Sequence, residues 1–329
     1  MMLRCGNAPL SKYNGAFLFY PDLGSSAFGT NTHCSRESMR RLLLFIVLIG
    51  FLIRTDSANA QTAVVDHWFG DFANAVSLSL NATGDVFVLD AGKNEVSEFT
   101  AKGEPVKMIG GRGWGELEFD APTDVSANFA LDLYVCDYNN RRLQRFDRKM
   151  NFIQSFTADN IVPSFTGSFY PRASALSTQG ELFVVESDGR RVLKFDPAQH
   201  LEREFGSFNA GAGALVNPRD IIVTQDGKVI VLDEHRIVEY DAYANYLSSI
   251  ALDSLAAPSS LNRANGGLLV VEAKRIIVYS IEGLKRLVIE PQSLIGTASS
   301  EEFRDAVIVG STLYLLTLHN VVVAKINLD

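Results

Sequence analysis

The chain has 329 residues, of which 47% are hydrophobic and 21% are charged, a balance typical of a folded globular protein rather than a disordered one. The formal net charge of −8 argues against non-specific binding to nucleic acid or to an anionic membrane surface, because both carry negative charge. The chain has 10 prolines, 25 glycines and no long run of charged residues. This composition excludes a collagen, a coiled coil and a low-complexity tail.

The first sixty residues are expected to be a leader that the folded protein does not keep. The apolar run at residues 42–53 is too short to span a bilayer, which needs about 20 apolar residues. It follows a methionine and an arginine pair and precedes Ala-Asn-Ala, the pattern of a signal peptide cut after Ala60. We therefore predict a mis-start or disordered extension at 1–38, a signal peptide at 39–60, and a secreted or periplasmic protein. The alternative is a genuine extension with an uncleaved anchor.

The cysteines and charges fit this prediction of export. Removal of residues 1–60 would leave Cys136 as the one cysteine, so no internal disulfide could form. It would also remove six basic and three acidic residues, which changes the net charge from −8 to −11. The expected product is an acidic, soluble protein.

The remaining residues, 61–329, repeat one unit six times. One marker is a short apolar strand that ends in an acid, and another is the aromatic residue that closes the next strand. Both markers recur every 39 to 49 residues, and a sixth copy at 312–317 lacks the acid. The acids are Asp90, Asp137, Glu186, Asp233 and Glu272. The aromatic residues are Phe99, Phe146, Phe195, Tyr240 and Tyr279. Self-similarity at such a period is typical of repeat architectures.

Each unit is predicted to contain four short strands joined by turns rich in Gly, Asn and Asp. Strands such as 133–136 and 182–185 are apolar at every position, whereas a strand with one solvated face would alternate. These sheets must therefore be covered on both faces. Six four-stranded sheets stacked in a ring meet this requirement and leave few open edges. The predicted fold is all-β: a six-bladed β-propeller of four-stranded blades.

The two ends of the repeat region predict how the ring closes. The sixth unit reaches Asp329 without a fourth strand. Residues 64–72 resemble the fourth strand of the third unit, with a Phe-Gly pair at Phe69 that matches the pair at Phe205. We therefore expect the N-terminal strand of the mature chain to complete the last blade.

The second unit, residues 111–147, carries the clearest signature: a G-R-G-W-G loop, a G-x-x-x-F-x-x-P segment, a strand ending in Asp, then N-x-R and a closing F-D. This unit resembles the NHL repeat. Units three and four, 170–196 and 217–241, resemble it more loosely, and the likeness covers nearly all of 62–329. The resemblance implies the propeller fold. It leaves the function open, because the family includes binding platforms, sensor ectodomains, RNA binders and a few lyases or hydrolases.

The five repeated acids could be taken for a catalytic ring of carboxylates. Each of them, however, ends a strand before a tight turn, where a carboxylate can accept hydrogen bonds from backbone N–H groups. A feature present in nearly every blade is expected to serve the fold. We therefore predict that these acids cap turns.

Three arginines are predicted to surround one mouth of the central channel. Arg172 and Arg219 each follow a repeated proline at the start of the innermost strand, and Arg304 aligns with them in the sixth unit. Guanidinium groups offer paired donors that suit a carboxylate, a phosphate or an acidic peptide. The alternative is that each arginine pairs with an acid of a neighbouring blade. The candidate acids are Asp124, Asp220 and Asp305.

Two histidines are weak candidates for a metal site. His235 and His319 fall in the turn between the second and third strands, which should open on the same face as the arginines. With a third ligand they could bind zinc. No His-x-His or His-x₃-His spacing supports such a site, so no cofactor is expected, and zinc or calcium is the alternative.

Trp114 lies in the glycine-rich loop between the first and second units. An exposed tryptophan there would suit contact with a partner. The alternative is that it packs over the junction between two blades.

These features predict an exported, rigid binding platform that holds a peptide, a glycan or an anionic small ligand at the channel mouth. The expected partner is a protein, peptide or glycan, without nucleic acid or a membrane span, and the protein is expected to be monomeric. The alternative is a metal-dependent lyase or hydrolase with its site at the same mouth. An enzyme needs a convergent acid, base or metal cluster, and the sequence does not assemble one.

Overall fold

The structure of the protein, a computed structural model, describes residues 63–127, 132–161, 168–253, 257–296 and 301–326. All of them belong to the larger of the chain's two compact units, Ser57–Asp329. The expected leader, residues 1–60, lies outside the described residues, so the signal peptide and export stay predictions. In the described part of the chain, no helix is long and apolar enough to cross a membrane.

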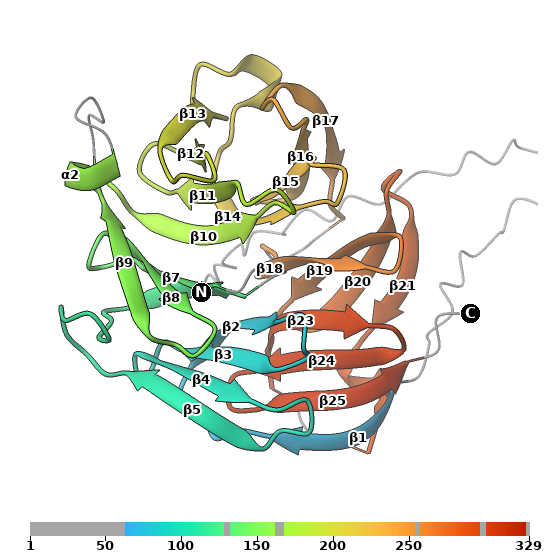
Figure 1. The fold of residues 1–329 in the computed structure, drawn as a ribbon. Coiled ribbons are helices and arrows are strands. Elements are labelled where there is room, and N and C mark those ends of the chain that lie inside the picture. The colour runs from blue at the N-terminus through green and yellow to red at the C-terminus, as the bar shows by residue number, and fades with distance from the viewer. Residues whose placement is uncertain (1–62, 128–131, 162–167, 254–256, 297–300, 327–329) are drawn as a thin grey trace, which may run out of the picture. The chain divides into compact units, whose positions relative to one another are not determined.

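The described chain forms six β-sheets, which we number as blades 1 to 6 in chain order (Figure 1). Blade 1 contains β2 (Ala75–Leu80), β3 (Val86–Asp90), β4 (Glu95–Phe99) and β5 (Pro105–Gly110). Blade 2 contains β6 (Pro122–Ser126), β7 (Asp132–Asp137), β8 (Arg142–Asp147) and β9 (Phe152–Thr157). Blade 3 contains β10 (Pro171–Leu176), β11 (Leu182–Glu186), β12 (Arg191–Phe195) and β13 (Leu201–Phe205).

Blade 4 contains β14 (Pro218–Val223), β15 (Val229–Asp233), β16 (Arg236–Tyr240) and β17 (Tyr246–Ala251). Blade 5 contains β18 (Ser260–Ala264), β19 (Gly267–Glu272), β20 (Arg275–Ser280) and β21 (Lys285–Ile289). Blade 6 contains β23 (Phe303–Val309), β24 (Thr312–Thr317), β25 (Val321–Ile326), β1 (Ala63–Phe69) and the short β22 (Leu294–Ile295). The connections hold α2 (Ala158–Ile161), η1 (Gly211–Gly213) and η2 (Pro291–Ser293).

The six blades form a closed ring. The first strand of each blade lies beside the first strand of the next: β2 beside β6, then β10, β14, β18 and β23, and β23 lies beside β2 again. These six strands surround the central channel, and the later strands of each blade lie progressively further out (Figure 1). The prediction of a six-bladed β-propeller with four-stranded blades is confirmed.

Blade 6 combines strands from both ends of the described chain. β1 pairs antiparallel with β25, from Ala63 opposite Ile326 to Phe69 opposite Val321. β22 adds a short parallel pairing on the other side of β1, so this sheet has five strands. Phe69 is buried, and its ring centroid lies 5.0 Å from that of Phe99 in blade 1.

The apolar core is divided among the junctions between blades. Six clusters of buried side chains fill these junctions, one between each pair of neighbouring blades, including that between blades 6 and 1. The second strands β3, β11 and β15 are buried at every position. This explains why those strands are apolar on both faces, as the sequence predicted.

The pairing of β1 with β25 gives a prediction about stability. Phe69 is 8% exposed and Trp68, its neighbour on the opposite side of the strand, is 66% exposed. Phe69→Ala should lower the free energy of unfolding by about 3–5 kcal/mol, because it removes a buried aromatic ring and leaves a cavity. Trp68→Ala is the matched control and should change it by less than about 0.5 kcal/mol. Urea denaturation of both variants measures this, and equal stabilities would contradict the position of β1.

Candidate functional site

The two ends of the channel differ in what lines them. The far ends of β2, β10, β14, β18 and β23 line one cavity, so these first strands run in the same sense along the channel. We call the end where the first strands begin the arginine face, and the end where they finish the cavity face. Since the strands of a blade are antiparallel, the turns between second and third strands lie on the arginine face.

The repeated acids hold the backbone of the arginine face. Asp90 accepts hydrogen bonds from the N–H groups of Ala73 and Asn74, at 2.7 and 2.8 Å, and from Gly92 in its own turn, at 2.9 Å. Asp233 accepts hydrogen bonds in the same way from the two residues before β14. Glu186 also accepts from N–H groups of its own turn, whereas the hydrogen bonds to Glu272 come from the Arg275 guanidinium. The prediction that these acids bind turn N–H groups is therefore confirmed for Asp90 and Glu186.

Arg172, Arg219 and Arg304 are each the second residue of a first strand, in β10, β14 and β23. The Nε atom of each is buried and has no hydrogen-bond partner among the described residues. Burial lowers the pKa of the Arg172 guanidinium, and the positive charge of Arg219 lowers it further. The structure therefore brings Arg172 and Arg219 close enough to repel each other.

The alternative pairs each of these arginines with an acid of a neighbouring blade. Arg304 pairs instead with Glu302, at 3.3 Å between Nη2 and Oε2. Within the described residues, Arg172 and Arg219 make no ion pair, although the charge of Asp220 partly offsets the lowering of the Arg172 pKa. Sequence proximity suggested the pairing, but the aspartates of the first strands have other partners.

Those aspartates bind the backbone of the next blade. Asp124 accepts a hydrogen bond from the N–H of Ser174 at 2.8 Å, and Asp220 accepts one from Leu261 at 2.7 Å. Asp305 does the same with the N–H of Leu78 in blade 1, at 2.7 Å. The three carboxyl groups belong to blades 2, 4 and 6, so they connect blade 2 to 3, blade 4 to 5 and blade 6 to 1.

Burial in the channel changes the acidity of these carboxyl groups. It raises the pKa of Asp124 to about 6 and that of Asp305 to about 7, against the opposing effect of their hydrogen bonds. The pKa of Asp220 is raised well above its usual range, by burial first and then by the charges of the other two aspartates. All three side chains therefore hold a proton more tightly in the folded protein than in the unfolded chain.

An aromatic and basic group next to Arg172 was not predicted from the sequence. Tyr138, in the turn after β7, lies with its ring centroid 5.2 Å from that of Tyr170, which precedes β10. The guanidinium of Arg141 lies over the Tyr170 ring, 5.0 Å from its centroid. The interaction with Tyr138 raises the pKa of Arg172, against the larger effects of burial and of Arg219. Tyr138, Arg141 and Tyr170 are single residues in two different loops, so no repeated motif in the sequence indicated that they lie together.

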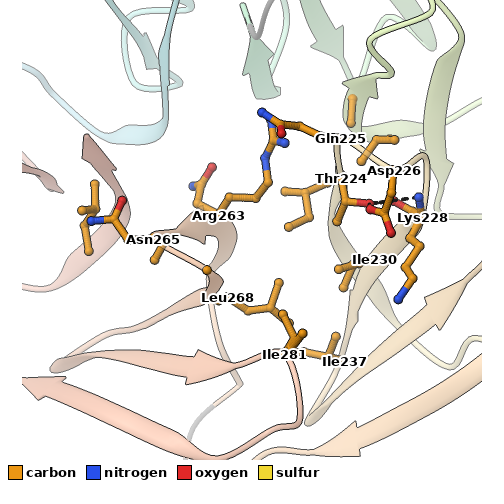
Figure 2. Close-up of a pocket in the computed structure, with 18 of the residues that line it drawn as sticks. Thr224, Gln225, Asp226, Lys228, Ile230, Ile237, Arg263, Asn265, Leu268 and Ile281 are labelled. Carbon is orange, nitrogen blue, oxygen red and sulfur yellow. Dashed lines mark hydrogen bonds between the residues drawn. The ribbon is translucent and has the colours of Figure 1, made fainter. Parts of the chain in front are cut away.

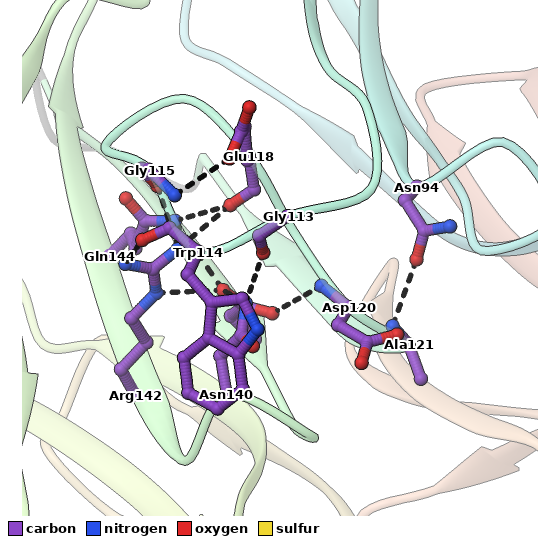
Figure 3. A network of polar contacts seen from close by, with 11 residues as sticks. Asn94, Gly113, Trp114, Gly115, Glu118, Asp120, Ala121, Asn140, Arg142 and Gln144 are labelled. Atoms are coloured by element: carbon purple, nitrogen blue, oxygen red, sulfur yellow. Dashed lines mark hydrogen bonds and ion pairs between the residues drawn. The ribbon is translucent and has the colours of Figure 1, made fainter.

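Trp114 is presented by a loop that the rest of blade 2 holds rigidly (Figure 3). Arg142 donates hydrogen bonds to the carbonyl oxygens of Trp114, Gly115 and Glu118, at 2.8, 2.8 and 2.9 Å. Asn140 donates to the carbonyl oxygen just before Trp114, at 2.7 Å. The tryptophan is nevertheless 73% exposed. This exposure contradicts the alternative in which Trp114 packs over the blade junction, and contact with a partner stays a prediction.

The two candidate histidines do not form a metal site with other described residues. His235 and His319 lie in the turns before β16 and β25, on the arginine face as expected. His319 Nδ1 lies 2.9 Å from the carbonyl oxygen of Phe72. Among the residues that the structure describes, no group of three or more His, Cys, Asp or Glu side chains is placed to hold a metal ion.

The cavity face has a feature that the sequence analysis missed. A cavity of about 870 Å³ opens there at the end of the channel and extends between blades 4 and 5 (Figure 2). Its lining includes Arg263, Gln225 and Asn265 near the channel, and a wall of isoleucines. Residues from five blades contribute, each from a different repeat, so no local motif could have indicated it.

Comparison with known proteins supports the fold. The structure is similar to virginiamycin B lyase from Staphylococcus aureus, with a TM-score of 0.55 and 15% sequence identity over 77% of this chain and 80% of that one. It is also similar to a chain in a nidogen/laminin complex, with a TM-score of 0.54 and 13% identity over 67% and 81% of the two chains. At such low identity these likenesses show the propeller fold alone.

One known protein is similar in sequence over part of the chain. A stretch of 137 residues is 27% identical to the protein brain tumor of Drosophila melanogaster. The match covers 40% of this chain and 12% of that protein, so the chain corresponds to a small part of that relative. No family model matches the sequence.

The channel aspartates predict a pH dependence of stability. Because the folded-state pKa of Asp124 is raised from 3.8 to about 6, its contribution is fully present below pH 3.8 and is lost as the pH rises through about 6. The free energy of unfolding of the parent should therefore fall more steeply between these values than that of Asp124→Asn, by at most about 1.4 kcal/mol per pH unit. Urea denaturation over this pH range measures the difference.

Asp124→Asn is a suitable variant because its amide can still accept from the N–H of Ser174 and can donate to the Ser77 hydroxyl, which now binds Asp124 at 2.9 Å. Asp159→Asn, on the exposed helix α2, is the control and should follow the parent. Parallel pH profiles for the parent and Asp124→Asn would show that Asp124 is not a buried titrating group.

Proposed function

We propose that this protein is an exported propeller of the NHL type that serves as a rigid platform and binds an anionic ligand at the arginine face. The ligand is a carboxylate-bearing or phosphate-bearing peptide, glycan or small molecule, and an acidic peptide of a partner protein is the class we favour. A similar fold occurs in the nidogen/laminin complex, which is consistent with a role in binding a protein.

One observation carries this proposal: the Nε groups of Arg172, Arg219 and Arg304 are buried without a partner among the described residues. A buried donor that lacks a partner costs about 1–3 kcal/mol, and two adjacent guanidinium groups add repulsion. An anion between them would relieve both costs, since carboxylates and phosphates accept paired hydrogen bonds from guanidinium groups. The arginine cluster therefore favours binding of an anion, whereas without a ligand it destabilises the folded protein.

The neighbouring aromatic groups favour a peptide as the ligand. Tyr138 and Tyr170 are half-buried, and their tilted rings lie 5.2 Å apart between centroids, so a bound chain could contact them while its carboxylate meets the guanidinium groups. Trp114 is exposed on a loop that leads into blade 2 on the same face. Tyrosine, tryptophan and arginine are the residues most enriched at the centres of protein interfaces.

The alternative, a metal-dependent lyase or hydrolase with its site on the same face, rests on likeness of fold to virginiamycin B lyase, which at 15% identity does not extend to chemistry. Such an enzyme needs an acid–base pair or a ligand set that converges on one point. The groups that converge here are guanidinium and phenol side chains, which suit binding of an anion.

A titration with hexaglutamate peptide and with citrate tests the proposal. Both probes should bind the parent, more weakly at high salt because the contacts are ionic. The Arg172→Gln/Arg219→Gln/Arg304→Gln variant should bind roughly tenfold more weakly or worse, since it loses charge-assisted hydrogen bonds. Isothermal titration calorimetry measures these affinities.

Arg148→Gln, in the exposed turn between β8 and β9, is the matched control for removal of positive charge. It should leave both affinities unchanged. Equal losses in the control and the triple variant would mean that binding follows net charge alone, and unchanged binding by the triple variant would move the site away from the arginine face.

A further inference from the structure

The cavity on the cavity face lies at the opposite end of the channel from the arginine cluster. Its volume, about 870 Å³, falls within the range of roughly 300–1,000 Å³ that is usual for small-molecule sites. It is formed by ordered strands of blades 4 and 5 together with the ends of three other first strands. The cavity is therefore a preformed site that is independent of the proposed function.

The end of the cavity nearest the channel is polar and carries a positive charge. Arg263, in β18, extends toward Gln225, which lies in the turn after β14 (Figure 2). Arg263 is half-buried, and this burial lowers the pKa of its guanidinium. Asn262 is held by Asp305, with 2.9 Å between Nδ2 and Oδ1, which fixes the strand that carries Arg263. A guanidinium in such a position favours an anionic group.

The other end of the cavity is apolar. Ile237 and Leu268 are buried there, Ile250 is half-buried, and Ile281 is 68% exposed at the rim (Figure 2). These side chains come from β16, β19, β17 and the turn after β20. Ile281 therefore extends the apolar wall to the rim of the cavity.

The cavity lining also holds three acids, Asp226, Glu239 and Glu282, and one lysine, Lys228. Lys228 Nζ lies 2.9 Å from Glu239 Oε1, and Glu239 also accepts a hydrogen bond from Ser248 at 2.9 Å. Asp226 lies near Lys228, whose charge lowers the pKa of that carboxyl group, after the larger effect of its hydrogen bond with Thr224. Lys228 therefore faces two of these acids, and Arg263 is the basic residue of the lining at the inner end.

We propose that this cavity binds a monocarboxylic acid with an apolar body. Its carboxylate accepts hydrogen bonds from the Arg263 guanidinium and the Gln225 amide. Its apolar body lies against the wall of Ile237, Ile250 and Leu268 between blades 4 and 5. The exposed Ile281 closes over the end of the body at the rim.

Calorimetric titration of the parent with decanoate, below the concentration at which it forms micelles, tests this proposal. One equivalent should bind per chain. Decyltrimethylammonium, which has the same apolar body and the opposite charge, should bind roughly tenfold more weakly or not at all. Equal binding of the two probes, or no binding of decanoate, would overturn the proposal.

Two pairs of variants locate the site. Arg263→Met should weaken decanoate binding by roughly tenfold to hundredfold, whereas Arg148→Met, on an exposed turn, should not change it. Ile250→Ser should weaken it several-fold, whereas Leu247→Ser, on the opposite face of β17, should have no effect. Retained affinity in both Arg263→Met and Ile250→Ser would overturn the proposal.

The triple glutamine variant of Arg172, Arg219 and Arg304 separates this proposal from the function proposed above. It should bind decanoate as the parent does, because those arginines lie at the other end of the channel. Loss of decanoate binding in that variant, with Arg263→Met unaffected, would overturn the cavity proposal and assign the acid to the arginine face.

Discussion

The structure depends on hydrogen bonds between buried carboxyl groups and the backbone of the next blade. The first strand of each blade is the edge of its sheet. One side of its backbone pairs with the second strand, and the other side faces the channel and the neighbouring blade. Buried N–H groups must find an acceptor. Asp124, Asp220 and Asp305 supply one to each following blade, and burial keeps these carboxyl groups far more basic than in water.

This use of the aspartates has a consequence for the arginines beside them. Because the carboxyl groups bind backbone N–H groups, they do not pair with Arg172 and Arg219, although they lie close in sequence. The repeated acids Asp90 and Asp233, at the ends of second strands, are likewise held by loop N–H groups. Positive charges therefore remain on the arginine face of an acidic protein. Natural sequences break local rules of this kind chiefly at functional sites.

The sequence was sufficient to predict the repeat, the strands and the ring, because runs that are apolar on both faces require covered sheets. It also placed Arg172, Arg219 and Arg304 at the start of first strands. It could not decide which acid each arginine meets, since that depends on backbone geometry between blades. The exposure of Trp114 was likewise undecided, because it depends on how Arg142 and Asn140 hold the loop. The cavity was missed because five repeats contribute to it and none contains it.

If the arginine cluster serves a ligand and not the fold, chemical denaturation can show this without knowledge of the ligand. Arg172→Met should be at least as stable as the parent, because it removes a buried charge beside Arg219. Arg142→Met should lose about 3 kcal/mol, because Arg142 pairs with the buried Asp137 at 2.8 Å and holds three loop carbonyl groups. A loss for Arg172→Met as large as that for Arg142→Met would show that the cluster is structural and contradict the account.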